Sequence, residues 1–281
     1  MADALKVRDR HDARETVAAA TASGEIQQLR DGRAGVYAGL NAAAANDPCA
    51  FCTEGVFTVP KTASIVILDG QEVYWDHSAN KAHFKPQNDK DFYLGVAVGD
   101  AASAATTMKV NLNVRPRYIV NTNDMGYEGS FDHIPVLTAG APFLRRQGAT
   151  QTAGFSATAE AQKLDLLSKR SFPVDSQWIL EAGVEVVTNA DADVADLNVG
   201  VANATHASDA NSITESNFFH FDMGADLNLD AESDDGTTEV NATDTTVDWA
   251  VGTPDHLMID GRDHTDIQMY VEGVLGLSGR K

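Results

Sequence analysis

Short runs of alternating apolar and polar residues, separated by turn-forming residues, dominate this chain. Residues 56–60 (VFTVP) follow the period-2 pattern of a strand with two unlike faces. The pair Asp69-Gly70 is a strong turn signal between the apolar runs 65–68 and 73–75. Strand-like runs recur at about ten-residue spacing, as in β-sandwiches and barrels. The pattern therefore predicts an all-β protein.

The N-terminal strand runs predict a small closed β-barrel. Six such runs follow one another, at residues 25–29, 34–39, 54–61, 70–76, 92–99 and 108–113. No run carries a nucleophile–base pair or a metal-binding cluster. We therefore predict that this part acts through a binding surface and not through catalysis. We place the first domain at residues 1–113, with residues 1–13 as an N-terminal arm.

Residues 114–281 are predicted to form a connector and a second, β-sandwich domain. Arginines, prolines and glycines mark the connector, and residues 159–167 fit a helix or a strand equally well. Strand-like runs separated by acidic or glycine-rich turns follow, at residues 178–187, 196–202, 218–222, 227–230, 237–242, 256–260 and 266–271.

Four N-terminal motifs in a fixed order resemble the phage capsid cement (head decoration) family. They are EGVFTVPK at 54–61, DGQEVYWD at 69–76, DFYLGVA at 91–97 and MKVNLN at 108–113. The resemblance implies a small β-barrel that binds the outside of an icosahedral head, usually as a trimer, without catalysis. The implied partners are the major capsid protein and further copies of the chain. The implied place is the outer capsid surface of the virion, after synthesis in the host cytoplasm.

The second half resembles the concanavalin-A-like (laminin-G-type) jelly roll. The motifs are FFHF at 218–221, ESDDGTT at 232–238, HLMIDG at 256–261 and DIQMYVEG at 266–273. Glu272 stands where that family commonly has Asp. The resemblance implies a jelly-roll sandwich that projects from the shell, but lectins, glycosidases and structural appendages share this fold. The alternative function is therefore a virion adhesin that binds host glycans through this domain.

Aromatic residues decide where a glycan would bind. The available ones are Trp178, Trp249 and Tyr270, and Trp249 is the best candidate because Asp248, Gly252 and Pro254 place it beside a loop. The competing interpretation is that Trp249 belongs to the core.

The charge is strongly acidic, with a net value of −20 and a pI of 4.6. Nucleic acid is disfavoured as a partner because phosphate contacts need Lys and Arg. The acidity indicates either a solvated surface or divalent-cation binding. The Asp-rich stretch 226–236 lacks EF-hand spacing, so calcium remains an alternative to a solvated turn, and no cofactor is predicted. No apolar run reaches the ~20 residues of a membrane span, and the N-terminus lacks a signal-peptide core.

Two residue pairs invite a chemical interpretation that we weigh against a structural one. Cys49 and Cys52 have C-x-x-C spacing but no further zinc ligands at finger spacing, and they fit two small, mostly apolar residues of a strand. Glu181 and Glu185 share one face of a predicted strand, as a glycosidase acid pair could, but solvent-facing glutamates are the simpler interpretation. No Gly-x-Ser-x-Gly elbow is present, so the chain is predicted not to be an enzyme.

Overall fold

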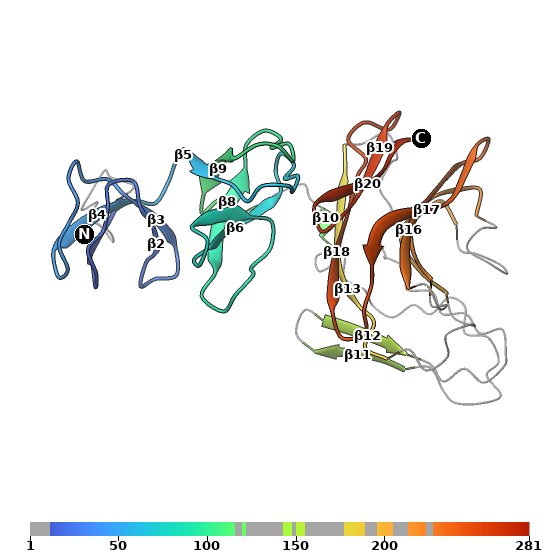
Figure 1. Ribbon diagram of the computed structural model, residues 1–281, viewed down its shortest axis with the longest axis horizontal. Helices are drawn as coiled ribbons and strands as arrows, with labels where there is room; N and C mark the ends of the chain where they lie inside the picture. The colour runs from blue at the N-terminus through green and yellow to red at the C-terminus, as the bar shows by residue number, and fades with distance from the viewer. Residues whose placement is uncertain are drawn as a thin grey trace, which may run out of the picture. The chain divides into compact units, whose positions relative to one another are not determined.

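The computed structural model describes residues 12–115, 120–121, 143–147, 150–154, 177–188, 196–204, 213–222 and 227–280. Every regular element in these residues is a β-strand, which confirms the all-β prediction. The chain divides into two compact units, Met1–Arg117 and Tyr118–Lys281 (Figure 1), which are described separately below.

The first sheet of the N-terminal unit has four antiparallel strands in the order β1-β4-β3-β2. Their bounds are Asp12–Thr16 for β1, Ile26–Gln28 for β2, Ala34–Tyr37 for β3 and Pro48–Cys52 for β4. A small core lies on this sheet and contains Val17, Leu29, Ala43, Cys49 and Phe51. Residues 12–13 of the predicted N-terminal arm belong to β1, and residues 1–11 lie outside the described residues.

The second sheet of this unit has five strands in the order β5-β9-β8-β6-β7. Their bounds are Val56–Pro60 for β5, Glu72–Asp76 for β6, Lys81–His83 for β7, Phe92–Ala97 for β8 and Thr107–Leu112 for β9. The edge strands β5 and β7 meet at one parallel bridge between Lys61 and Ala82, where Thr62 N donates to Ala82 O at 3.0 Å.

The N-terminal strands therefore form two sheets and not the single closed barrel that we predicted. The chain passes from one sheet to the other between β4 and β5, at Thr53, Glu54 and Gly55, where Gly55 has a φ of 115°. That backbone turn interrupts the ladder between consecutive strands, so β4 pairs with β1 and β3 while β5 pairs with β9. No closed barrel is found among residues 12–115.

A larger core joins the two sheets. Ile26, Ala34 and Val36 of the first sheet belong to one buried cluster with Trp75, Phe92, Leu94 and Val110 of the second. Full burial of one such large apolar side chain stabilises the fold by about 1.5–3 kcal/mol. Gly95 lets β8 approach β9, because a Cβ there would lie 2.1 Å from the carbonyl oxygen of Asn111. Its φ of 154° also favours glycine.

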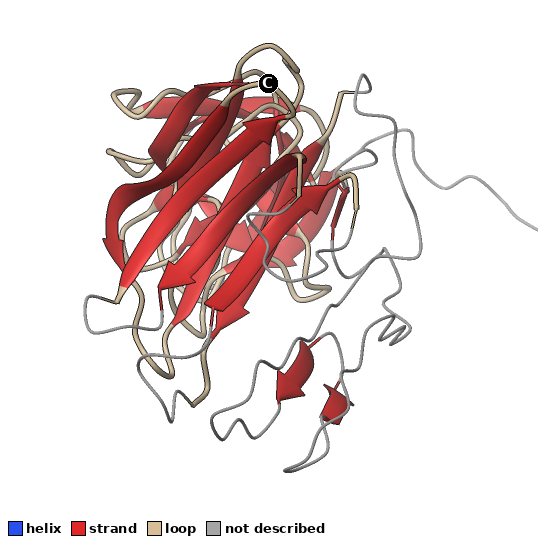
Figure 2. Ribbon diagram, turned by 90° about the vertical axis from the view of Figure 1, so that its right-hand side faces the viewer, coloured by secondary structure: helices blue, strands red, loops and turns tan. Residues whose placement is uncertain are grey.

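The C-terminal unit contains two larger sheets and a hairpin (Figure 2). One sheet has the order β10-β13-β18-β19-β20, with bounds Val120–Asn121, Ile179–Glu185, Pro254–Asp260, Ile267–Val271 and Val274–Arg280. The other has the order β14-β15-β16-β17, with bounds Asp196–Ala202, Glu215–Asp222, Asn228–Asp235 and Glu239–Asp248. The hairpin joins β11 (Phe143–Gln147) to β12 (Thr150–Gly154).

The two larger sheets share one core. Leu180, Leu257 and Met269 from the first sheet cluster with Phe219 and Leu229 from the second. Strands β14 to β17 form a continuous antiparallel meander, which is inserted between β13 and its partner β18. Two sheets around one core agree with the coarse prediction for this half, but the described strands do not establish a jelly roll. Residues 159–167, left open above, lie outside the described residues.

Candidate functional site

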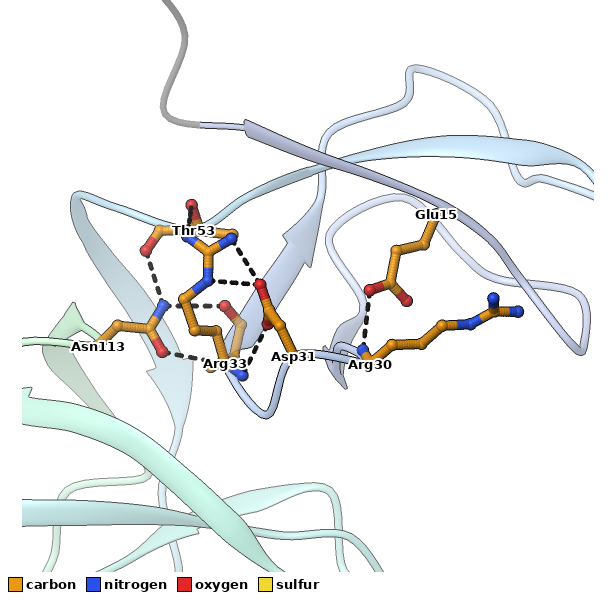
Figure 3. A network of polar contacts seen from close by, with 7 residues as sticks. Glu15, Arg30, Asp31, Arg33, Thr53 and Asn113 are labelled. Carbon is orange, nitrogen blue, oxygen red and sulfur yellow. Dashed lines mark hydrogen bonds and ion pairs between the residues drawn. The ribbon is translucent and has the colours of Figure 1, made fainter. Parts of the chain in front are cut away.

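The two N-terminal sheets are held together by the side chain of Asn113, which follows β9 (Figure 3). Its Oδ1 accepts a hydrogen bond from Ala34 N at 2.9 Å, and its Nδ2 donates to Ala34 O at 3.0 Å. Nδ2 also donates to Thr53 O at 2.7 Å. The φ of Asn113 is 58°, a left-handed conformation that Asn tolerates better than most residues. One side chain therefore connects the end of β9 to β3 and to the residue after β4.

An ion pair borders this clamp on the surface of the first sheet (Figure 3). The Arg33 guanidinium approaches Asp31 Oδ2 at 2.7 Å and donates to Thr53 Oγ1 at 3.3 Å. The hydrogen bond from Arg33 lowers the pKa of Asp31 below its ordinary value. Both side chains are about half exposed, so solvent screens the pair and it contributes little stability. Its structural role is to order the turn that presents Ala34 to Asn113.

The exit of the chain from the second sheet is fixed by an aromatic cluster. Tyr93 donates its hydroxyl hydrogen bond to Val114 O at 2.5 Å, and the Arg115 guanidinium lies 4.4 Å from the centroid of the Tyr93 ring. Tyr74 packs edge-on against Tyr93 and donates to Glu72 at 2.8 Å. Burial raises the pKa of both phenols. Both tyrosines therefore stay neutral donors at physiological pH.

Carboxylates order the turns of the second sheet. Asp69 accepts from Gly99 N at 2.6 Å, and its own N–H donates to Asp100 Oδ1 at 2.7 Å, which ties the Asp69-Gly70 turn to the turn after β8. Asp76 accepts hydrogen bonds from the Ser78 hydroxyl and from backbone N–H groups, which lower the pKa of Asp76. These carboxylates are engaged with their own backbone, which is a structural role.

Charge is divided very unequally between the two units. Residues 1–117 hold 13 Lys and Arg against 14 Asp and Glu, a net charge of −1. The remaining residues hold 8 Lys and Arg against 27 Asp and Glu, a net charge of −19. The net charge of −20 for the whole chain does not reveal this asymmetry. Only the N-terminal unit can therefore approach another acidic surface without strong repulsion.

The aromatic residues predicted for glycan contact are buried. Trp249 is 1% exposed, and its ring lies 6.3 Å from that of Phe221 in the core between the sheets. Trp178 and Tyr270 are 3% and 4% exposed. The position of Trp249 after β17 turns its ring inward, and this burial favours the competing interpretation that Trp249 belongs to the core. The structure described here presents none of the three as a stacking platform.

The residues weighed for chemistry are placed apart or engaged in structure. Glu181 lies 3.6 Å from His256 Nε2, whereas Glu185 is exposed farther along β13. Cys49 is buried and Cys52 half-buried, and both are free thiols in β4. Asp235 of the Asp-rich stretch accepts from the N–H groups of Thr237 and Thr238 in a turn. Within the described ranges, no three His, Cys, Asp or Glu residues gather as a metal site would need.

Comparison with known families identifies the N-terminal part. Residues 7–112 match the family described as phage cement protein. Searches among curated proteins and among solved structures gave no match. The cement match confirms the first resemblance, and nothing in these comparisons supports the jelly-roll resemblance of the second half.

The function of the matched part follows from the family. Phage cement proteins decorate and stabilise capsids, are not enzymes, and sit on the capsid surface of the virion. The predicted capsid decoration function, its non-enzymatic character and its location are thus confirmed on the strength of residues 7–112. The family also implies binding to the capsid, whereas it shows neither a trimer nor a bound glycan. In the part of the chain that the structure describes, no helix is long and apolar enough to cross a membrane.

Proposed function

We propose that this cement protein docks on the major capsid protein through its N-terminal unit and carries its C-terminal unit outward. The observation that carries the proposal is the coincidence of two boundaries. The family match ends at residue 112, and the near-neutral unit ends at Arg117. A docking unit with a net charge of −1 meets no general repulsion from another protein surface, whereas a unit of −19 is suited to solvent.

The proposed mechanism is mechanical. Copies that bridge neighbouring capsomers bury surface that the bare shell leaves open, and so resist pressure from the packaged genome. A stable contact of this kind buries on the order of 1,000 Å² or more. Individually weak contacts add on a symmetric lattice, because each bound module raises the effective concentration of the next.

The experiment that tests the division of labour uses the two units as separate fragments. Residues 1–117 and residues 118–281 would each be mixed with empty capsids assembled from the cognate major capsid protein. Residues 1–117 should sediment with the capsids, as the full chain does, and residues 118–281 should stay in the supernatant. Saturable binding by residues 118–281 alone would show that docking was assigned to the wrong unit.

We also propose a homotrimer, because threefold and quasi-threefold positions of an icosahedral shell select one. Light scattering of the purified chain measures its mass, and cryo-electron microscopy of decorated capsids shows the symmetry of the bound form. A monomer in solution is compatible with trimerisation on the shell. A bound form without threefold symmetry is not compatible with the proposal.

We also propose a finer fold for each unit. The Lys61–Ala82 bridge supports a barrel-like closure of the second N-terminal sheet. The shared core of the C-terminal sheets supports a sandwich, and a jelly roll remains our proposal for it. The alternative function as a glycan-binding adhesin has no favouring observation among the described residues, since its three aromatic candidates are at most 4% exposed.

A further inference from the structure

Two loops of the first sheet lie side by side and create one continuous surface. Residues 17–25 follow β1, and residues 38–47 connect β3 to β4. Thr21 and Ala43 form an antiparallel bridge, with N–H···O distances of 3.0 and 2.9 Å. Asn46 N donates to Val17 O at 2.8 Å farther along the same pair of loops. The loops are therefore ordered by each other and present their outer side chains together.

This surface is apolar, and we call it the Leu40 patch. It consists of Leu40 and the exposed alanines at positions 18–20, 42, 44 and 45. Leu40 is 97% exposed, the highest value among the large hydrophobic residues of the described part, whose next value is 60% at Val187. A leucine that is almost fully exposed gains none of the roughly 1.5–3 kcal/mol that burial would contribute. It contributes nothing to the fold of the isolated chain.

Charge is sparse on this surface. The two loops contain two ionisable side chains, Glu25 and Asp47, and Asp47 Oδ2 accepts a hydrogen bond from Ala44 N at 2.9 Å. The Glu25 carboxylate is engaged locally, because Oε2 accepts from Ala22 N at 2.8 Å and Oε1 accepts from Gln27 Nε2 at 2.9 Å. An exposed apolar surface bounded by polar residues is characteristic of a protein interaction site.

We propose that the Leu40 patch is a contact surface of this protein for the outer face of the capsid shell. The inference rests on the proposed function, which supplies the partner and leaves the contact surface open. The patch lies within the segment that matches the cement family, in the unit whose net charge is −1. A contact between copies of the chain is the competing occupant, and the oligomeric mass of the variant below distinguishes it from the shell. The matching shell surface should be apolar and free of ionisable groups.

The test compares the full-length wild type with Leu40→Asp and with the matched control Val187→Asp. Val187 is 60% exposed and lies in the C-terminal unit, so it receives the same new charge far from the patch in the sequence. Binding to empty capsids would be measured by co-sedimentation over a concentration series. Leu40→Asp should weaken binding at least tenfold, whereas Val187→Asp should bind as the wild type does.

The outcomes separate this inference from the function on which it rests. Failure of the wild type itself to bind capsids would contradict the proposed function. Equal binding by wild type and Leu40→Asp would refute the patch and leave the function standing. A change in oligomeric mass in Leu40→Asp, with unchanged capsid affinity, would assign the patch to contacts between copies. If Leu40→Asp does not fold, as judged by circular dichroism, Leu40→Ser and Ala44→Asp replace it with the same expected loss.

Discussion

The side-chain amide of Asn113 is hydrogen-bonded to both backbone groups of Ala34, although the two residues lie 79 positions apart. The amide occupies the place of a neighbouring strand, since it accepts from the N–H and donates to the C=O of one residue (Figure 3). A third bond, to Thr53 O, adds the residue that follows β4. The relative position of the two N-terminal sheets thus depends on one side chain as well as on the shared core.

Replacing Asn113 by alanine should destabilise the N-terminal unit by about 2.5–5.5 kcal/mol. The variant loses three hydrogen bonds, each with a net value of about 0.5–1.5 kcal/mol. Alanine also lacks the side-chain amide with which asparagine tolerates a φ of 58°, and this strain costs on the order of 1 kcal/mol. Asn113→Gly removes the bonds without that strain and should lose less. Chemical denaturation measures both.

The control for this prediction is Asn88→Ala, which removes an exposed amide whose bond to Ser78 Oγ is 3.4 Å long. Its free energy of unfolding should stay within about 0.5 kcal/mol of the wild type, as is usual for surface substitutions. Equal stability of Asn113→Ala and Asn88→Ala would mean that the shared core alone holds the sheets.

The free energy of unfolding of the N-terminal unit should rise with pH as Lys61 loses its proton. This side chain is 1% exposed, and its Nζ donates to the carbonyls of Thr62 and Ala105, at 2.9 and 3.1 Å. Burial lowers the pKa of Lys61 below its ordinary value of 10.5. Between the folded-state pKa and 10.5 the unfolded chain binds the extra proton, so the free energy of unfolding increases with pH.

Lys61→Met isolates this effect, because it keeps an unbranched side chain and removes the titrating group. Relative to this variant, the wild type should gain stability as pH rises through that window, by up to about 1.4 kcal/mol per pH unit. Below the folded-state pKa the difference between the two proteins should be constant. The exposed Lys81→Met is the control, and its difference from wild type should stay flat. A flat difference for Lys61→Met as well would show that the buried amine stays charged at no cost.

Tyr93→Phe tests how the chain leaves the second sheet. The phenylalanine ring can still form the cation–π contact with the Arg115 guanidinium, but the hydrogen bond to Val114 O is lost. We expect a stability loss below about 1.5 kcal/mol and faster amide hydrogen exchange at Val114 and Arg115. Arg115→Ala removes the cation–π contact instead, which is worth about 0.5–1 kcal/mol at an exposed site. Unchanged exchange in both variants would mean that the cluster does not order these residues.

Local patterns in the sequence predict strands well where two faces differ. The strand-like runs at 54–61, 70–76, 92–99 and 108–113 correspond to β5, β6, β8 and β9, and the Asp69-Gly70 turn is present. The same reasoning misses β1, since residues 12–16 (DARET) carry charges and no apolar alternation. Polar edge strands of this kind are common, because charge protects an exposed edge from pairing with other chains.

Relationships between distant residues could not be read from local patterns. The split into two sheets depends on the backbone turn at Gly55 and on the bonds of Asn113 to Ala34 and Thr53, which lie far away in the chain. The Leu40 patch could not be predicted from the sequence for the same reason. An alanine-rich loop has no distinguishing periodicity, and its exposure is defined only when a second loop pairs with it.

Trp249→Ala should destabilise the C-terminal unit by about 3–5 kcal/mol, the usual cost of deleting a buried large aromatic side chain. Trp249 is 1% exposed, packs against Phe221 and donates its backbone N–H to Leu227 O at 3.1 Å, so its removal leaves a cavity between the two sheets. Trp249→Phe fills part of that cavity and should lose less. Differential scanning calorimetry of the full chain measures the loss, and the N-terminal transition serves as the internal control. Any glycan binding lost only in Trp249→Ala would therefore report unfolding and not a missing sugar contact. Wild-type stability of Trp249→Ala would contradict the core assignment and return this tryptophan to the surface.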